Sequence, residues 1–583
     1  MKAKRSAKKE SGVNSRMQFL VTAIFLLFGI IFLRLCQLQI IKHGFYSALA
    51  QGQHELYTQI VPQRGEIYLK DDSSGGQYSV AVNKEMHLVY AVPRSIDTAK
   101  RADIARRLSE KLGMGYDEVM EKLSKPDDPY EVIKKKVENA VAEEIEKEEL
   151  EGIGIAPESF RYYPGGELAA NVIGFVGYSG NEKKGQYGIE GSCNDRLEGK
   201  SGFLAQEKDA FGSWISFGNK SFESAVNGDD VVLTLDYTVQ YLAEQKLKAA
   251  VEEYGAESGS VIIMDPKTGA ITAMADYPTY DLNKYSEVED MGLYLNSNVH
   301  EIYEPGSVQK VVTMAIGIDS GKVNPSTTYT DTGLAQIDGW NIRNSDGKAN
   351  GVQTMVNVLE KSLNTGTIYI EQLVGKKDYY AYLKKFGLDS PTGIEIRGEV
   401  VGNLANLEVN SDINYATASF GQGISVTPLE MLTAIAALAN DGKLMKPYLI
   451  DSYVGADGKA TKTEPQVVRQ AVSSRTANLV SAMMVSVVEN GHAQGAKIPG
   501  YKIGGKTGTA QIPSKDKKGY EQGKSIHTFI GFGPLPNPRF AILVKLDSPE
   551  ALWAESTSVK VFHDISKELV QYYHLAPTEE TEK

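Results

Sequence analysis

The sequence of 583 residues is poor in the side chains that usually mark metal centres and disulfide-stabilised folds. Its two cysteines, Cys36 and Cys193, lie far apart, so we expect no disulfide. Its eight histidines form no cluster with the spacing of metal ligands, so we expect no metal and no cofactor. The formal net charge of −12 argues against a nucleic-acid partner.

Charge is also missing from one segment near the N-terminus, residues 17–33. As a helix this segment would span about 25 Å, close to the apolar thickness of a bilayer, and residues 34–41 can lengthen it. Because a basic segment precedes it, the positive-inside rule places the N-terminus in the cytoplasm and the rest of the chain outside. We predict a cytoplasmic basic tail at 1–16 and a transmembrane signal anchor at 17–41. A cleaved signal peptide is the alternative, although no small side chains of a cleavage site follow.

Three short motifs follow one another along the chain: Ser307-Val308-Gln309-Lys310, Ser362-Leu363-Asn364 and Lys506-Thr507-Gly508-Thr509. Each is common by itself, but their order indicates an active-site serine that works without a catalytic histidine.

The first motif lies in an apolar run, residues 306–318, that predicts a buried helix. Ser307 and Lys310 would then be one turn apart on the same face. Apolar surroundings lower the pKa of an amine, so Lys310 could be neutral and act as the base for Ser307. The free N–H groups at the helix start favour developing negative charge. The alternative is a core helix with an incidental serine and lysine.

The second motif lies between two predicted helices, residues 352–361 and a helix starting near Thr365. Such a loop could point both polar side chains into a cleft. Ser362 could relay a proton between Lys310 and the leaving amine, and Asn364 could bind the substrate amide. The alternative is that Asn364 caps the second helix. The predicted catalytic residues are Ser307, Lys310, Ser362 and Asn364.

The third motif lies in a glycine-rich segment, residues 501–512, that we predict to be a strand. Glycines in a strand often mark close approach of another backbone, so a peptide substrate could lie along it as an extra strand. The side chains of Lys506 and Thr507 would hold the substrate's terminal carboxylate, and the N–H groups of Thr509 and Ser307 would form an oxyanion hole. The predicted substrate-binding residues are Lys506, Thr507, Gly508 and Thr509.

Two other patterns need weighing. Residues 500–507 match the phosphate-binding loop, but that motif must run straight into a helix, whereas a strand and a turn are expected here. Glu399-Val-Val-Gly-Asn403 resembles the motif with which serine β-lactamases activate the deacylating water. Its surroundings fit a transpeptidase better, so we predict a structural role for Glu399.

The motifs together resemble those of class B penicillin-binding proteins, which are membrane-anchored D,D-transpeptidases of cell-wall synthesis, and the resemblance covers nearly the whole chain. Further matches in the catalytic half are residues 261–271, 304–310, 421–428, 436–442 and 529–534. Matches to the non-catalytic half are residues 64–67, 161–164 and 188–191.

This resemblance and the patterning predict an α+β chain with two extracytoplasmic domains. Residues 44–225 would form a non-catalytic pedestal, or dimerisation-like domain, with a charged helical region at about 98–150. Residues 228–575 would form the transpeptidase domain, an antiparallel sheet flanked by helices. Its expected strands are 231–235, 259–265, 270–275, 501–512, 526–533 and 540–547, and its expected flanking helices are 238–252 and 559–573. The polar tail, 576–583, is predicted to be disordered.

The resemblance implies that Ser307 attacks the penultimate D-Ala carbonyl of a stem pentapeptide ending in D-Ala-D-Ala. Lys310 would take its proton, and the terminal D-Ala would leave, protonated through Ser362. An amine of a neighbouring stem would then form the cross-link, and β-lactams would trap Ser307. The alternatives are a serine β-lactamase or D,D-carboxypeptidase, in which water replaces the amine, and a non-enzymatic β-lactam receptor or scaffold.

The start Glu304-Pro-Gly-Ser resembles division-type enzymes, whereas elongation-type enzymes more often have Pro-Pro-Gly-Ser. It therefore implies septal cell-wall synthesis at the plasma membrane, with an elongation role as the alternative. The implied partners are a glycosyltransferase of the shape-elongation-division-sporulation (SEDS) family and divisome proteins. Val308-Gln309 departs from the family's usual Thr-Phe or Thr-Val and could alter β-lactam affinity.

Overall fold

The computed structural model describes residues 55–125, 128–180, 182–207, 220–514 and 519–578, together with scattered positions between 19 and 32. The chain divides into two units, residues 1–62 with 199–226 and residues 63–198 with 227–583. The predicted tail 1–16 and most of the predicted anchor 17–41 lie outside the described residues. Within the part that is described, no helix is long and apolar enough to cross a membrane.

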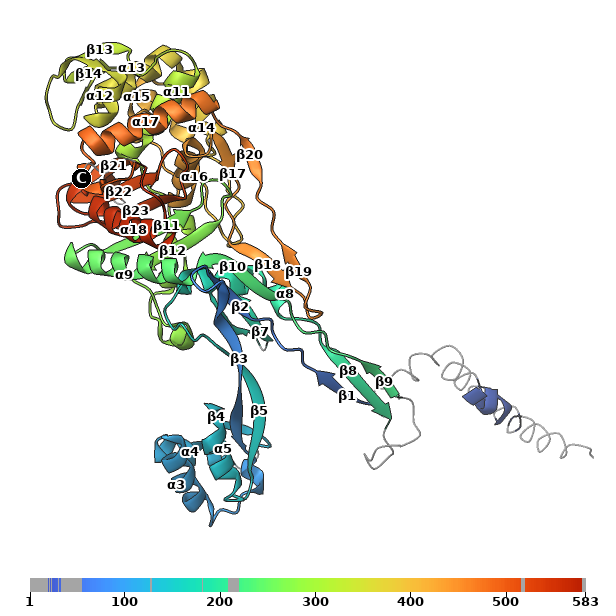
Figure 1. Cartoon of the computed structure of the whole chain (residues 1–583). Helices are drawn as coiled ribbons and strands as arrows, with labels where there is room; N and C mark the ends of the chain where they lie inside the picture. Colours follow the sequence, from blue (N-terminus) through green and yellow to red (C-terminus); the bar gives the residue numbers. More distant parts are fainter. Residues whose placement is uncertain are drawn as a thin grey trace, which may run out of the picture. The chain divides into compact units, whose positions relative to one another are not determined.

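The first unit contains a three-stranded antiparallel sheet in the order β1-β8-β9 (Figure 1). Its strands are Glu55–Ile60, Gly202–Glu207 and Lys220–Glu223. The middle strand, β8, pairs with both others, so segments far apart in the sequence form one sheet.

The second unit contains a seven-stranded sheet that combines strands from both halves of the chain. Its order is β19-β18-β10-β2-β3-β4, with β5 also paired to β3. The apolar strand β10 joins strands from the N-terminal and C-terminal halves of the chain, because it pairs in parallel with β2 and antiparallel with β18. The strands are β2 Ile67–Asp71, β3 Gly76–Ala91, β4 Glu131–Val137, β5 Ile153–Tyr162, β10 Asp230–Asp236, β18 Ile450–Val454 and β19 Ala460–Lys462.

A small separate core lies where β3, β4 and β5 meet three helices, α3 (Arg101–Leu112), α4 (Tyr116–Leu123) and α5 (Asn139–Glu146). The prediction of a helical region over about 98–150 is therefore wrong for 131–137, which is strand β4. Ile133 and Val137 are buried there while Lys135 and Lys136 are exposed, as in a strand with one face on a core.

The three sequence matches to the non-catalytic half, residues 64–67, 161–164 and 188–191, meet at one buried carboxylate. Glu190, on α7 (Gly188–Ser192), is fully buried between Arg64 and Arg161. Arg161 Nε lies 2.6 Å from Glu190 Oε1, and Arg64 Nε donates to Oε2 at 2.8 Å. Burial alone would raise the pKa of Glu190, but the two guanidinium groups hold it below its ordinary value. The cluster therefore fixes segments that are distant in sequence.

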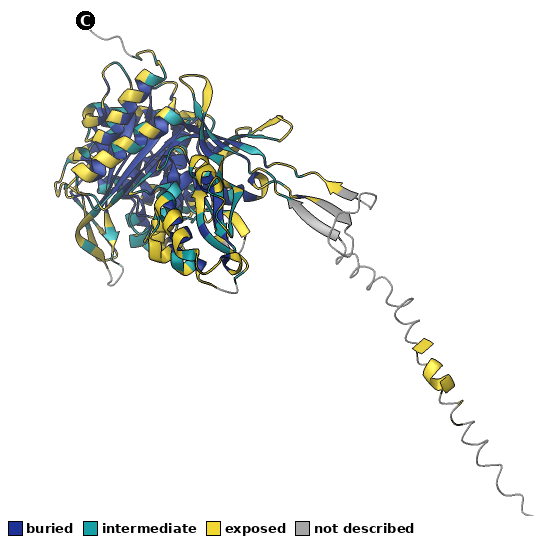
Figure 2. Cartoon of the chain, turned by 90° about the horizontal axis from the view of Figure 1, so that it is seen from below, coloured by how far each residue is buried: buried dark blue, intermediate teal, exposed yellow. Residues whose placement is uncertain are grey.

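A five-stranded antiparallel sheet, in the order β12-β11-β23-β22-β21, forms the centre of the C-terminal half. Helices α9 and α18 pack on one face, and α16 and α17 pack on the other. Figure 2 shows the buried residues concentrated in the sheet and on the inner sides of the helices. The elements are α9 Tyr237–Glu253, β11 Ser258–Met264, β12 Ile271–Tyr277, α16 Pro428–Leu438, α17 Ser474–Asn490, β21 Gly504–Pro513, β22 Tyr520–Gly533, β23 Phe540–Asp547 and α18 Ser558–Tyr572.

Further helices and hairpins complete this half around α11 (Gln309–Asp319). The helix predicted at 352–361 is wrong at its start, because residues 351–354 form strand β16 and α12 begins at Met355. Thr354 and Asn357 form a capping box that sets this boundary. The remaining helices here are α10 Ser297–His300, α13 Asn364–Val374, α14 Lys376–Lys385 and α15 Asp412–Ala418, and the short strands are β13 Thr328–Asp331, β14 Leu334–Ile337, β15 Trp340–Arg343, β16 Gly351–Thr354, β17 Lys443–Met445 and β20 Val467–Gln470.

The expected strands and flanking helices are present, with boundaries that shift by a few residues, but the strand expected at 231–235 is β10 of the seven-stranded sheet and not part of the antiparallel one. The prediction of a disordered tail is wrong for residues 576–578, because the Thr578 N–H donates to the Gly500 carbonyl at 2.8 Å. Residues 579–583 lie outside the described residues, as does Cys36, and Cys193 is a buried free thiol.

Candidate active site

Ser307 lies in a short 3-10 turn, η5 (Gly306–Val308), that leads directly into α11. The turn needs glycine at Gly306, whose φ is 55°, and its N–H donates to the Gly421 carbonyl at 3.0 Å. A Cβ at Gly421 would lie 2.1 Å from the Gly306 oxygen, so both glycines allow this close approach. Ser307 is left partly exposed at the start of a buried helix.

Lys310 follows one turn later and is fully buried. Its Nζ donates to the Ser362 carbonyl at 2.6 Å and lies 3.2 Å from Ser362 Oγ. Burial first, and then the nearby charge of Lys506, lower the pKa of Lys310 well below its ordinary value, while Asp346 acts in the opposite direction. The amine can therefore be neutral at physiological pH and can accept a proton.

Lys506 reaches the same hydroxyl from the sheet. Its Nζ donates to Ser362 Oγ at 3.1 Å, to the Thr507 carbonyl at 3.1 Å and to Thr507 Oγ1 at 3.3 Å. Burial lowers the pKa of Lys506 to about 8, although Glu555 opposes the shift. Ser362 thus lies between two buried lysines whose pKa values are both lowered by burial, and the charge of Lys506 further favours the neutral form of Lys310.

Strand β21, which carries Lys506 to Thr509, is the edge strand of the central sheet and, within the described part of the chain, pairs with β22 alone. One face of this strand packs against the start of α11. A Cβ at Gly508 would lie 2.9 Å from Val308 Cγ2 and 3.1 Å from the Pro305 oxygen, so only glycine permits this approach. The close approach brings the backbone of Thr509 to the turn that holds Ser307, as the predicted oxyanion hole requires.

Asn364 lies within the same region but does not cap its helix. It is the first residue of α13, whose N-cap position is Leu363, and its side chain makes no capping bond. The alternative of a capping role is therefore wrong. Asn364 Nδ2 instead donates to the Arg343 carbonyl at 2.8 Å, which ties the motif to β15.

Two residues beside the motifs were not predicted to have roles in the site geometry. Glu304 is buried and accepts hydrogen bonds from Gly423 N at 2.9 Å and from the Tyr520 hydroxyl at 3.1 Å. Burial raises its pKa. It therefore ties the start of the Ser307 turn to two other segments. Its position directly before Pro305, at the start of the first motif, could have suggested that Glu304 contributes to the site. Its partners, Gly423 and Tyr520, could not be predicted from the sequence. The second residue, Asp346, is distant from Lys310 in sequence. The fold brings its negative charge close enough to raise the pKa of the Lys310 amine.

The local structure argues against both competing patterns as functional sites. Residues 500–507 run into strand β21 and not into a helix, so they form no phosphate-binding loop. The Glu399 carboxylate accepts bonds from Thr392 N at 2.8 Å, Thr392 Oγ1 at 2.5 Å and Gly393 N at 3.1 Å. This is the structural role predicted for Glu399.

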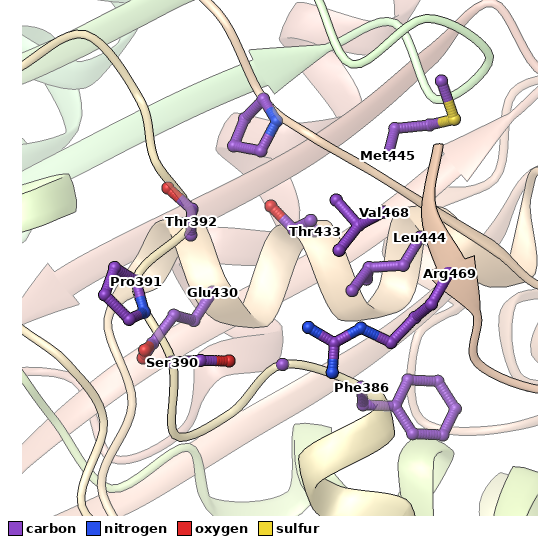
Figure 3. Close-up of a pocket in the computed structure, with 12 residues that line it drawn as sticks. Phe386, Ser390, Pro391, Thr392, Glu430, Thr433, Leu444, Met445, Val468 and Arg469 are labelled. Carbon is purple, nitrogen blue, oxygen red and sulfur yellow. The ribbon is translucent and has the colours of Figure 1, made fainter. Parts of the chain in front are cut away.

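Among the described residues no group of three or more histidine, cysteine, aspartate or glutamate side chains could hold a metal ion. A small cavity of about 40 Å³ lies elsewhere, between α16 and the loop after α14 (Figure 3). Its lining includes Glu430, Thr392 and Arg469 but no predicted site residue. Burial raises the pKa of Glu430 to about 7, and its carboxylate caps α16, so the cavity belongs to the packing of that helix.

Comparison with known proteins gives one consistent result. Residues 259–567 match the penicillin-binding protein transpeptidase domain, and residues 59–233 match the penicillin-binding protein dimerisation domain. Stage V sporulation protein D of Bacillus subtilis is 32% identical, over 92% of this chain and 82% of its own length. The probable peptidoglycan D,D-transpeptidase PenA of Neisseria meningitidis is 32% identical, over 93% and 90%. The structure of penicillin binding protein 3 from Mycobacterium tuberculosis with aztreonam is 27% identical, covers 90% of this chain and 99% of its own, and superimposes with a TM-score of 0.69.

Proposed function

The chain belongs to the class B penicillin-binding proteins, since its two halves match the dimerisation and transpeptidase domains, and we propose that it is a serine-type peptidoglycan D,D-transpeptidase. The observation that best supports this activity is the meeting of Lys310 and Lys506 at the hydroxyl of Ser362. The partly exposed Ser307 lies one turn before Lys310, so this proton acceptor and the anion-binding Lys506 share a site with the proposed nucleophile.

In the first step Ser307 Oγ attacks the penultimate D-Ala carbonyl of a stem pentapeptide. Neutral Lys310 accepts the hydroxyl proton, and the N–H groups of Ser307 and Thr509 bind the developing oxyanion. The C–N bond to the terminal D-Ala then breaks, and its nitrogen receives the proton through Ser362. An ester to Ser307 remains.

The peptide is held in place by β21 and its side chains. An edge strand offers unpaired backbone groups, so an extended peptide can add to it as a further strand. Lys506 and Thr507 bind the terminal carboxylate, Gly508 keeps the strand close to the serine, and Asn364 binds the peptide amide. β-Lactams imitate this terminus and acylate Ser307.

The rest of the chain delivers this site to its substrate. Residues 17–41 anchor the protein in the plasma membrane with its N-terminus in the cytoplasm, and residues 44–225 form a pedestal that carries the domain at 228–575 outside the cell. Charge patterning and the uncharged run 17–33 support this orientation. A SEDS-family glycosyltransferase and divisome proteins are the proposed partners.

The proposed physiological role is septal cell-wall synthesis, supported by the Glu304-Pro-Gly-Ser start. Sporulation is a second candidate because the B. subtilis relative carries a sporulation name. Depletion during vegetative growth distinguishes them: filaments with unfinished septa indicate division, swollen or rounded cells indicate elongation, and normal growth with defective spores indicates sporulation.

The transpeptidase activity is tested with a synthetic stem pentapeptide, an acceptor peptide and the purified full-length chain. We expect release of terminal D-Ala together with a cross-linked product, both absent in Ser307→Ala. Ser326→Ala, at an exposed serine, is the matched control and should behave as the wild type. Release of D-Ala with hydrolysis as the only outcome would identify a carboxypeptidase.

A further inference from the structure

The loop between β15 and β16 is fixed directly against the second catalytic motif. The Arg343 carbonyl at its start accepts the bond from Asn364, and Asn344 Oδ1 accepts one from Thr365 N at 3.2 Å. The buried carboxylate of Asp331 secures both ends of the loop, since it accepts bonds from Asn344 Nδ2 at 2.9 Å and from Asn350 N at 3.0 Å. The loop is therefore held in place beside the active site.

Asp346 lies at the tip of this loop with its side chain exposed. Its Oδ1 accepts the Lys348 N–H at 2.9 Å, which forms a tight turn. Its charge nevertheless acts on the buried amine of Lys310, so the exposed carboxylate lies within electrostatic range of the catalytic base.

The other charges near the site show why one exposed carboxylate matters. Lys506 is positive and buried, and Arg343 and Lys348 add exposed positive charge on the same loop. Glu555 acts on Lys506, but its Oε2 is buried in the structure. Such a site suits the anionic terminus of the donor peptide and repels a cation.

We propose that Asp346 binds the cationic amine of the acceptor peptide and brings it to the acyl-enzyme beside Lys310. This inference rests on the proposed transpeptidase function, in which the acceptor is a primary amine that is protonated in solution. The exposed carboxylate attracts the ammonium group, whereas it has no attraction for water or for an uncharged amine.

The covalent step balances as follows. The acceptor ammonium releases one proton to solvent near Lys310, and its nitrogen forms a C–N bond to the acyl carbon. The C–Oγ bond to Ser307 breaks, and the second amine proton passes through Lys310 to Ser307 Oγ. Asp346 forms and breaks no bond, so its effect is on the capture of the acceptor.

The chain supplies a close control for this residue. Asp457-Gly-Lys459 repeats the sequence Asp346-Gly-Lys348, and Asp457 Oδ1 accepts the Lys459 N–H at 3.0 Å in the same kind of exposed turn, between β18 and β19. Asp346→Asn and Asp457→Asn therefore remove the same charge from the same local structure.

The experiment acylates the full-length chain with a thioester of N-acyl-D-alanine and measures how the acyl-enzyme divides between amine and water. The acceptors are D-lysine, which is cationic, and methoxyamine, which is uncharged at neutral pH. Thiolate release reports acylation, and chromatography separates the amide from the hydrolysis product.

We expect Asp346→Asn to lower the aminolysis-to-hydrolysis ratio for D-lysine about fivefold, the size of one exposed charge interaction, and to leave the methoxyamine ratio unchanged. The effect should shrink in high salt and be restored in Asp346→Glu. Equal ratios in Asp346→Asn, Asp457→Asn and wild type would overturn the inference. An equal loss for both acceptors would also overturn it, because it would show a structural role. If the wild type forms no acyl-enzyme, the proposed function itself fails.

Discussion

Replacing Lys506 by methionine should make the protein more stable and less active. The side chain is fully buried, and burial lowers its pKa from an ordinary value of 10.5 to about 8. Since a tenfold change in an equilibrium constant corresponds to about 1.4 kcal/mol, keeping this ammonium charged in the folded protein costs about 3 kcal/mol. Methionine has a similar length and needs no hydration.

The substitution also removes three hydrogen bonds, to Ser362 Oγ and to two oxygens of Thr507. Leaving the buried Thr507 carbonyl without this donor costs about 1 kcal/mol. The net expectation at pH 7 is a gain of about 2 kcal/mol in the free energy of unfolding, or a rise of about 3 °C in Tm. Acylation by benzylpenicillin should fall about 10- to 100-fold, because a charge-assisted bond to the carboxylate is lost.

The pH dependence gives the sharper test. The pKa of Lys506 is lower in the folded chain than in the unfolded chain, so between pH 8 and 10.5 the unfolded state binds more protons and the wild type gains stability as the pH rises. The cost of the charge is fully present below about pH 8, and its loss should bring the advantage of Lys506→Met to about zero near pH 9.5. Thermal unfolding of both proteins from pH 7 to 9.5 measures this convergence.

The control is Lys524→Met. This substitution removes an exposed lysine of the neighbouring strand β22 that forms an ion pair with Glu257. Because this ion pair is exposed to solvent, its loss should change stability little at pH 7 and at pH 9.5. A Lys506→Met variant that is less stable than wild type by the same amount at pH 7 and 9.5 would refute the reasoning, because no buried charge would have been relieved.

Two further substitutions test other parts of the site. Gly508→Val should reduce acylation at least 100-fold, with a loss of about 1–3 kcal/mol in stability, because its Cβ would meet Val308 Cγ2 at 2.9 Å; near-normal acylation with an intact fold would contradict the close approach. Glu399→Gln should leave the lifetime of the penicilloyl adduct unchanged within about twofold and lower stability by about 1 kcal/mol, since its carboxylate accepts bonds from Thr392 and Gly393. A much longer-lived adduct, followed by intact mass, would show that Glu399 activates water.

The order of the three motifs predicted one shared site, and within it the structure joins Lys310, Ser362 and Lys506 by hydrogen bonds. The sequence could not place Lys506 on Ser362, since that contact joins a strand to a loop 144 positions away. Nor could it show that Ser362 has a left-handed backbone with φ of 56°, which lets its carbonyl and hydroxyl face one lysine.

Local patterns predicted most strands and helices of the C-terminal half because apolar runs there are long and bounded by turns. They failed where pairing with a neighbouring strand, and not the local sequence pattern, determines the structure of a short segment. Residues 131–137 carry three lysines among β-branched residues and pair with β3, and residues 351–354 pair with β13 before the helix can start. The partners of Glu304 and the nearness of Asp346 to Lys310 were also out of reach, since both depend on contacts made only by the fold.

The central claim is that Ser307 is the nucleophile of a transpeptidase, and one measurement tests it most directly. The full-length chain is incubated with benzylpenicillin, its intact mass is followed over time, and the modified peptide is sequenced. The account predicts a single, lasting adduct on Ser307 that is absent in Ser307→Ala. An adduct on another residue, an adduct that disappears within seconds, or no adduct at all would contradict it.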